Sequence, residues 1–162
     1  MGDLEVRLDL VGTAVFAIVT VVGVVVFSST TNTLVVATDL TLFAIGIVAF
    51  LLGYWTAVQR SRVDEISVVE LFLMMGNTSP SRVKRIMVWC LGAQVVIGVA
   101  GALARSSTDG KSGSVLAFGI LVPMFGLGLN GRWVATYGVF SPRKLVEVPL
   151  PEGQVGQDTD HG

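Results

Sequence analysis

The sequence carries little charge for its length. Only 14% of its 162 residues are charged, and 52% are hydrophobic. A typical soluble domain has about 25% charged residues, so a soluble fold of this composition would have too little polar surface. The mean hydropathy of +0.73 supports the same conclusion. We predict a single all-α domain that is embedded in a membrane.

Residues that build metal sites and disulfides are almost absent. The chain has one cysteine, Cys90, and one histidine, His161, which excludes an intramolecular disulfide and any cysteine- or histidine-based metal cluster. It also lacks an HExxH motif, a glycine-rich phosphate loop and a GxSxG elbow. Its basic residues form no dense patch. We therefore predict no enzymatic activity, no cofactor, no metal and no nucleic-acid partner.

Four apolar runs dominate the sequence. Each has about the 20 residues that are needed to cross roughly 30 Å of hydrocarbon. The runs cover residues 8–27, 36–58, 86–104 and 115–133. Pro123 interrupts the fourth run and predicts a kinked helix, because proline removes one backbone hydrogen bond. We predict a four-helix transmembrane domain over residues 1–140, arranged as two hairpins, and a mostly disordered tail over residues 141–162.

Basic residues at the ends of the runs predict the orientation. If both termini are cytoplasmic, nine of the eleven basic residues lie inside and two lie outside. The inner set is Arg7, Arg60, Arg62, Arg82, Lys84, Arg85, Arg132, Arg143 and Lys144, and the outer set is Arg105 and Lys111. This asymmetry follows the positive-inside rule and predicts that both the N- and the C-terminus are cytoplasmic.

The second and fourth runs end alike. Leu51-x-Gly53-x-Trp55-x-Ala57 matches the segment LNGRWVA of residues 129–135 at an offset of 78 residues. The match suggests two parallel hairpins related by an axis along the membrane normal. The alternative is coincidence, because glycine and tryptophan are common at membrane edges.

Four polar residues inside the runs are candidates for an intramembrane site: Asp39, Gln94, Asn130 and Arg132. Asp39 could pair with a cation or carry a proton, but we favour a place at the helix N-cap or first turn. Gln94 is expected to hydrogen-bond a neighbouring helix rather than a substrate. Arg132 could pair with Asp9, although an arginine at this position more often extends to lipid phosphates.

The longest polar connection, residues 59–85, lies between the second and third runs. Within it, residues 63–75 predict a cytoplasmic helix that lies at the membrane interface. Its second half, VVELFLMM, is apolar all round except for Glu70. The candidate partner-contact residues are Val69, Phe72, Leu73, Met74 and Met75. We favour the interpretation that this segment lies on the membrane surface without a protein partner. The alternative is that a partner protein docks on it.

A family resemblance is carried by the block that runs from ELFLMMGNTSPSRVKR, residues 70–85, through LAFGILVPMFGLGLNGRWVATYGVFSPR, residues 116–143. The chain resembles the uncharacterised small four-helix integral membrane proteins of actinobacteria. That resemblance implies a bacterial plasma membrane but no transferable activity.

Two functions follow as hypotheses. The first is a non-enzymatic accessory or assembly subunit of a larger membrane or envelope complex, with protein partners or copies of itself in the bilayer. The second is a small homo-oligomeric transporter or channel that uses the intramembrane polar residues.

Overall fold

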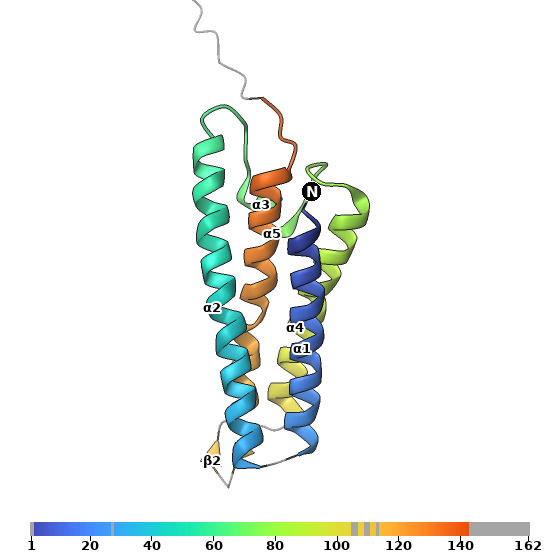
Figure 1. Cartoon of the computed structure of the whole chain (residues 1–162), viewed down its shortest axis with the longest axis vertical. Helices are drawn as coiled ribbons and strands as arrows, with labels where there is room; N and C mark the ends of the chain where they lie inside the picture. Colours follow the sequence, from blue (N-terminus) through green and yellow to red (C-terminus); the bar gives the residue numbers. More distant parts are fainter. Residues whose placement is uncertain (1, 27, 105–106, 109–110, 113, 143–162) are drawn as a thin grey trace, which may run out of the picture.

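The computed structural model describes residues 2–26, 28–104, 107–108, 111–112 and 114–142. Its elements are the helices α1 (Asp3–Val25), α2 (Ser29–Arg60), α3 (Val68–Leu73) and α4 (Ser81–Ala104), the strands β1 (Ser107–Thr108) and β2 (Lys111–Ser112), the 3₁₀ helix η1 (Val115–Leu121) and α5 (Pro123–Tyr137). The long helices lie side by side in one bundle, and both ends of the described chain are at the same end of it (Figure 1). The predicted tail, apart from its first two residues, lies outside the described residues.

Within the described residues, four helical stretches are long and apolar enough to cross a membrane: α1, α2, α4 and the combined η1–α5 stretch, Val115–Tyr137. The predicted fold class, an all-α protein with four membrane-length helices, is confirmed. The helices extend beyond most of the predicted apolar runs. For example, α2 begins at Ser29 because the Ser28 hydroxyl accepts a hydrogen bond from the Thr31 N–H at 3.1 Å and so caps the helix.

The most extensive packing is between α2 and α5, which run in the same direction (Figure 1). Three pairs along this interface, each separated by 78 residues in the chain, lie next to one another. They are Gly46 with Met124, Gly53 with Gly131, and Arg60 with Gly138. The glycines let the two backbones approach closely, as is typical of helix pairs in membranes. The two helices are therefore parallel and packed in register.

The fourth membrane-length stretch is broken near its middle. Residues 115–121 form a 3₁₀ helix, and the α-helix begins only at Pro123. Pro123 has no N–H to continue the ladder. Around it the Val122 N–H bonds the Gly119 carbonyl at 3.2 Å, and the Phe125 N–H bonds the Val122 carbonyl at 2.8 Å. The irregularity predicted at Pro123 is thus a change of helix type.

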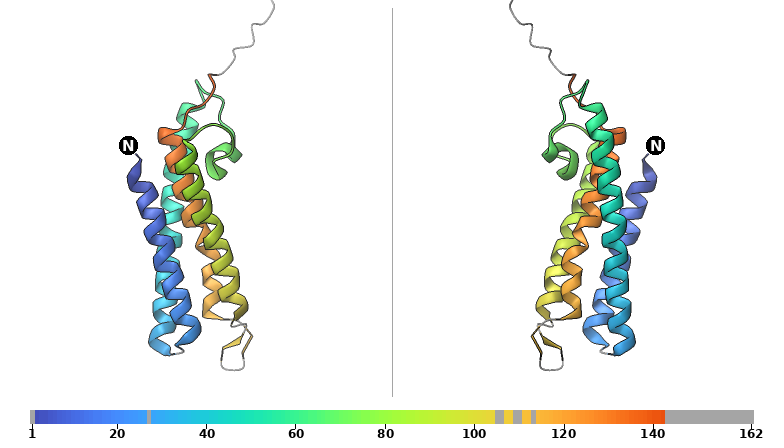
Figure 2. Two further views of the ribbon diagram at one scale, coloured as in Figure 1. Left: turned by 90° about the vertical axis from the view of Figure 1, so that its right-hand side faces the viewer. Right: turned by 90° about the vertical axis from the view of Figure 1, so that its left-hand side faces the viewer.

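The connection between α2 and α4 differs from the predicted interfacial helix. Only Val68–Leu73 is helical, and α3 packs against α5 near the N-terminal end of the bundle (Figure 2). Phe72 is 7% exposed and Met74 is fully buried. The reason is that Gly131 leaves room for the Phe72 ring, which stacks on Phe50 with 4.4 Å between ring centroids. Phe72 and Met74, two of the candidate partner-contact residues, are therefore buried inside the bundle and not on its surface.

Arg60 joins this connection to the end of α5. Its guanidinium donates to the Ala135 carbonyl at 2.9 Å and to the Gly138 carbonyl at 3.2 Å. It also donates to Asp64 at 3.2 Å. The last carbonyls of a helix have no partners within the helix, so a guanidinium suits this position. The segment after α2 and the end of α5 consequently form one unit.

Candidate functional site

The inward face of α1 carries acidic and small residues. Its buried residues recur every three or four positions and are Glu5, Asp9, Gly12, Phe16, Thr20 and Gly23. This spacing places them on one face of the helix. The opposite face is exposed and, beyond Asp3 and Arg7 in the first two turns, carries mainly valine, leucine and isoleucine side chains. A carboxyl cannot be solvated by hydrocarbon, so α1 turns its acidic face toward the other helices.

Asp9 lies at the centre of a hydrogen-bond network between three helices. It is fully buried. The Gln94 Nε2 on α4 donates to Asp9 Oδ1 at 3.0 Å and to Thr13 Oγ1 at 2.8 Å. The Gln94 Oε1 accepts the Gly126 N–H of α5 at 3.1 Å. Because a backbone N–H can only donate, this last bond fixes the orientation of the amide.

One oxygen of Asp9 is left over. Asp9 Oδ2 is buried and has no hydrogen-bond partner. The Cys90 thiol of α4 also faces Asp9 and Thr13. A buried carboxylate oxygen without a partner is costly in a low-dielectric interior unless it binds a proton or a cation. Asp9 is therefore poised to bind such a ligand.

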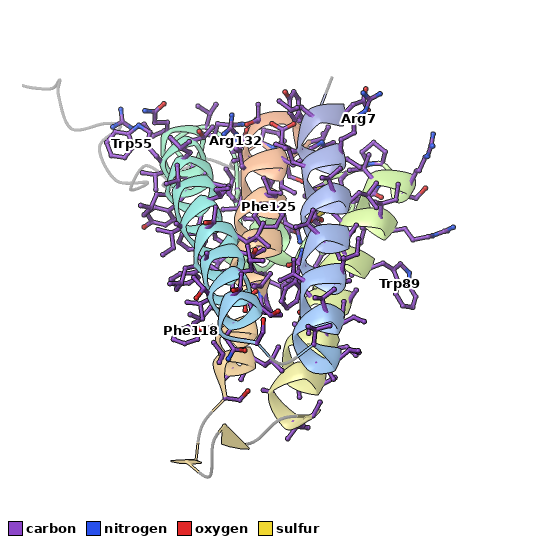
Figure 3. The ribbon with its side chains drawn as sticks, turned by 60° about the horizontal axis from the view of Figure 1, so that its bottom comes forward. Arg7, Trp55, Trp89, Phe118, Phe125 and Arg132 are labelled. Carbon is purple, nitrogen blue, oxygen red and sulfur yellow. The ribbon has the colours of Figure 1, made fainter. Side chains whose placement is uncertain are left out.

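The break at Pro123 brings a helix N-terminus to this network. Gly126 lies in the first turn of α5, where backbone N–H groups have no partner within the helix. The positive end of the α5 dipole thus points toward Gln94. Gln94 connects it to the Asp9 carboxyl. Phe125, beside Gly126, lies among the helices, whereas Trp89 and Phe118 point away from the bundle (Figure 3).

Glu5 lies one turn from Asp9, toward the N-terminal end of the bundle. Its Oε1 is 3.8 Å from Arg132 Nε, and its Oε2 has no partner. The Arg132 side chain is 46% exposed while that of Glu5 is buried. The suggested pairing of Arg132 with Asp9 is wrong, because Glu5 lies one turn closer to this arginine. Glu5 therefore lies between the buried Asp9 and the partly exposed Arg132 at the surface of the bundle.

Asp39 is buried, with an exposed fraction of 1%. It is the eleventh residue of α2, and the cap of that helix is Ser28. The favoured prediction of a cap or first-turn position for Asp39 is wrong, because the polar residues 28–33 begin the helix earlier. Asp39 Oδ1 has no hydrogen-bond partner. Asp39 is thus a second buried carboxyl with an unused oxygen.

The four predicted polar residues do not form one site. Asn130 is buried and donates from Nδ2 to the Phe72 carbonyl at 3.2 Å, so it fastens α3 to α5. Arg132 lies near the N-terminal end of the bundle, and Gln94 lies farther inside. Asp39 lies on α2. Along the bundle axis, Phe125 lies between Asp39 and Asn130.

Sequence reasoning missed Glu5, Asp9 and Thr13 as interior groups. Glu5 precedes the first apolar run and Asp9 is its second residue, so both are at the predicted membrane edge, where charges are common. A signal was present in the spacing of Glu5, Asp9, Gly12 and Phe16, which repeats every three or four residues on one face. In a membrane helix such a polar or small face is the one that packs inward.

Of the predicted partner-contact residues, Val69, Leu73 and Met75 are exposed. A cleft of about 1000 Å³ opens at the same end of the bundle, between the segment after α2 and residues 139–142. Its lining includes the carboxylates of Asp64 and Glu70. This end therefore offers both apolar and acidic surface.

Comparisons with protein-family models, with curated proteins and with solved structures found no match.

Proposed function

We propose that this chain is a non-enzymatic, four-span membrane protein that binds protons inside its helix bundle, as a small proton channel or proton-coupled transporter. Asp9 is the proton-binding group. The observation that carries the proposal is the complete burial of Asp9 with Oδ2 unpartnered. Ionisable groups at such depth commonly mark proton relays or ion pathways.

The pattern of donors around Asp9 favours a proton over a metal cation. Gln94 turns its N–H groups toward Asp9 and Thr13, while its carbonyl oxygen is already occupied by the Gly126 N–H. A hard cation such as Ca²⁺ needs about six to eight oxygen ligands, and this site offers far fewer. Among the described residues, no group of three or more His, Cys, Asp or Glu is placed to hold a metal. A proton on Oδ2 needs no such shell.

Glu5 is the proposed entry point for protons. It is buried one turn beyond Asp9 on the same face of α1, and its Oε2 is unpartnered. The exposed Arg132 beside it links this carboxyl to the aqueous edge. Two carboxyls at a spacing of one helical turn, about 5.4 Å, are close enough for a single water to bridge.

The orientation belongs to the same proposal. Arg7 and Arg132 lie at one end of the bundle (Figure 3), and by the positive-inside rule that end faces the cytoplasm of a bacterial plasma membrane.

The hairpins α1–α2 and α4–α5 are proposed to be a 2+2 parallel repeat. The in-register contacts of α2 with α5, at the same offset of 78 residues as the sequence match, support this repeat.

A second candidate function is the accessory or assembly subunit. The exposed side chains of Val69, Leu73 and Met75, next to an open acidic cleft, support it. A lipid-facing role for the same three residues predicts no protein contact. Crosslinking of the protein in native membranes, followed by mass spectrometry, separates the two.

The proton proposal is tested by reconstituting the chain into liposomes that contain a pH-sensitive dye. A potassium diffusion potential set with valinomycin then drives proton entry. We expect Asp9→Asn to lower the flux to that of protein-free liposomes, because the amide cannot release a proton. It keeps the shape of the side chain and an oxygen that accepts from Gln94.

Asp3→Asn is the matched control, because Asp3 is an exposed carboxylate on the same helix. Its flux should equal that of the unmodified protein. An unchanged flux in a folded Asp9→Asn variant would refute the proposal.

A further inference from the structure

We propose that Asp39 is a second proton-binding carboxyl, separated from Asp9 by a dry apolar layer, so that a proton crosses the bundle in two stages. This inference rests on the proposed function of Asp9. It assigns proton binding to Asp39 of α2, which lies farther than Asp9 of α1 from the end of the bundle that holds the N-terminus.

Contacts on either side of Asp39 locate it along the bundle. Val35, one turn before it, faces Gly23 of α1, where an added Cβ would lie 2.8 Å from Val35 Cγ2. Gly46, two turns after it, and Gly12 of α1 both face Phe125. Because α1 and α2 are antiparallel, Asp39 lies opposite residues 19–20 of α1. It is roughly ten residues, or about 15 Å, from Asp9 along the axis.

The interval between the two carboxyls is filled by buried apolar side chains. They are Phe16, Leu42, Val122 and Phe125, and we name them the apolar layer. Phe16 packs against Gly119, where an added Cβ would lie 3.2 Å from the ring. Side chains packed this closely leave no room for a continuous chain of water. A proton therefore cannot pass directly from Asp9 to Asp39 in this conformation.

The break in the fourth membrane-length stretch lies within the apolar layer. Val122 is the residue between the 3₁₀ helix and α5, and Pro123 follows it. A 3₁₀ stretch inside a long helix often marks a hinge, and Pro123 has already removed one ladder bond. Bending here moves Val122 and Phe125 away from Phe16 and admits water between the two carboxyls. The segment around Val122 and Pro123 thus belongs to the apolar layer that blocks the proton and also contains the hinge that would open this layer.

The elements around Asp39 carry no other titratable group close to it. Those of α1 are Asp3, Glu5, Arg7 and Asp9, all in its first two turns, and η1 has none. Those of α5 are Arg132 and Tyr137, near its far end, and those of α4 are Arg82, Lys84, Arg85 and Cys90, in its first three turns. Among the described residues, nothing ionic compensates a charge on Asp39. The unpartnered Oδ1 is therefore available to bind a proton.

The test combines infrared difference spectroscopy with the flux assay on the full chain in lipid. The acid-minus-alkaline spectrum of the unmodified protein should contain two carbonyl bands from buried, protonated carboxyls. Asp9→Asn should remove one band and Asp39→Asn the other. Asp39→Asn should also reduce proton flux to background, whereas the exposed control Thr41→Val should keep both bands and the flux.

The outcomes separate this inference from the proposed function. If the Asp9 band is present but Asp39→Asn changes neither spectrum nor flux, the second stage is refuted and the role of Asp9 stands. If Asp39→Asn lowers the flux while both bands remain, Asp39 is only structural and the inference again fails. If the Asp9 band is missing, the proposed function fails by itself. Should Asp39→Asn not fold, Asp39→Glu must retain flux and shift its band, and loss of flux in a folded Glu variant refutes the inference.

Discussion

Replacing Gly46 with alanine tests the parallel packing of α2 and α5 directly. The added methyl carbon would lie 2.5 Å from the Phe125 backbone nitrogen and 2.6 Å from the Met124 carbonyl carbon and oxygen, where ordinary contacts are 3.4–4 Å. These are backbone atoms, so no side chain can rotate to make space. The two helices must separate by about 1 Å, and overpacking of this kind costs roughly 1–3 kcal/mol.

Gly92→Ala is the matched control. An added Cβ at Gly92 meets nothing within 4 Å, and Gly92, like Gly46, lies within a helix. Both variants gain the same helix propensity, at most about 1 kcal/mol. The difference between them therefore isolates the clash, and Gly46→Ala should unfold more easily than Gly92→Ala by about 1–3 kcal/mol.

The measurement is the free energy of unfolding in bicelles, obtained by steric trapping and followed through tryptophan fluorescence. Trp133 on α5 is buried, and its indole Nε1 donates to the carbonyl of Gly2 at the start of α1 at 3.1 Å, so its fluorescence reports on unfolding of the helix bundle. Equal stability of the two alanine variants would show that α2 and α5 do not pack through Gly46, and the register argued above would be wrong.

Two further predictions follow. Phe16→Ala should raise the proton flux by opening the apolar layer, while Phe118→Ala, the same change on the outer surface, should leave it unaltered; equal fluxes would rule out a barrier at Phe16. Leu73→Asn should remove protein crosslinks in native membranes if the assembly role is correct, and the exposed control Leu4→Asn should retain them; crosslinks that persist in Leu73→Asn would exclude a contact there.

The number of spans and their approximate ends follow from the sequence. Runs such as residues 86–104 are apolar almost throughout, with Gln94 as an exception, and lipid selects helices by length and hydropathy whatever their neighbours. Pro123 likewise predicted an interruption, because the missing N–H is a local property. These features depend on each segment alone.

The rotation of each helix about its axis could not be predicted in the same way. In water the apolar face of a helix turns inward. In lipid most faces of a helix are apolar, and small residues that allow close approach determine which face packs inward. On α2 the inward face is the one that carries Gly46 and Gly53. Asp39 is on the same face and is therefore buried with them. The burial of Phe72 could not be predicted for a related reason, since Gly131 on a distant helix creates the space that the Phe72 ring fills.

The sequence by itself determined an all-α protein with four membrane-length helices, because the hydropathy of a segment depends only on its own consecutive residues. Only the tertiary structure decided that Asp9, Thr13 and Gln94 meet and that Asp39 is buried. Which polar groups share an interior depends on how helices far apart in the chain cross and rotate. That arrangement is set by the contacts between glycines and opposing backbones, and no single helix encodes it.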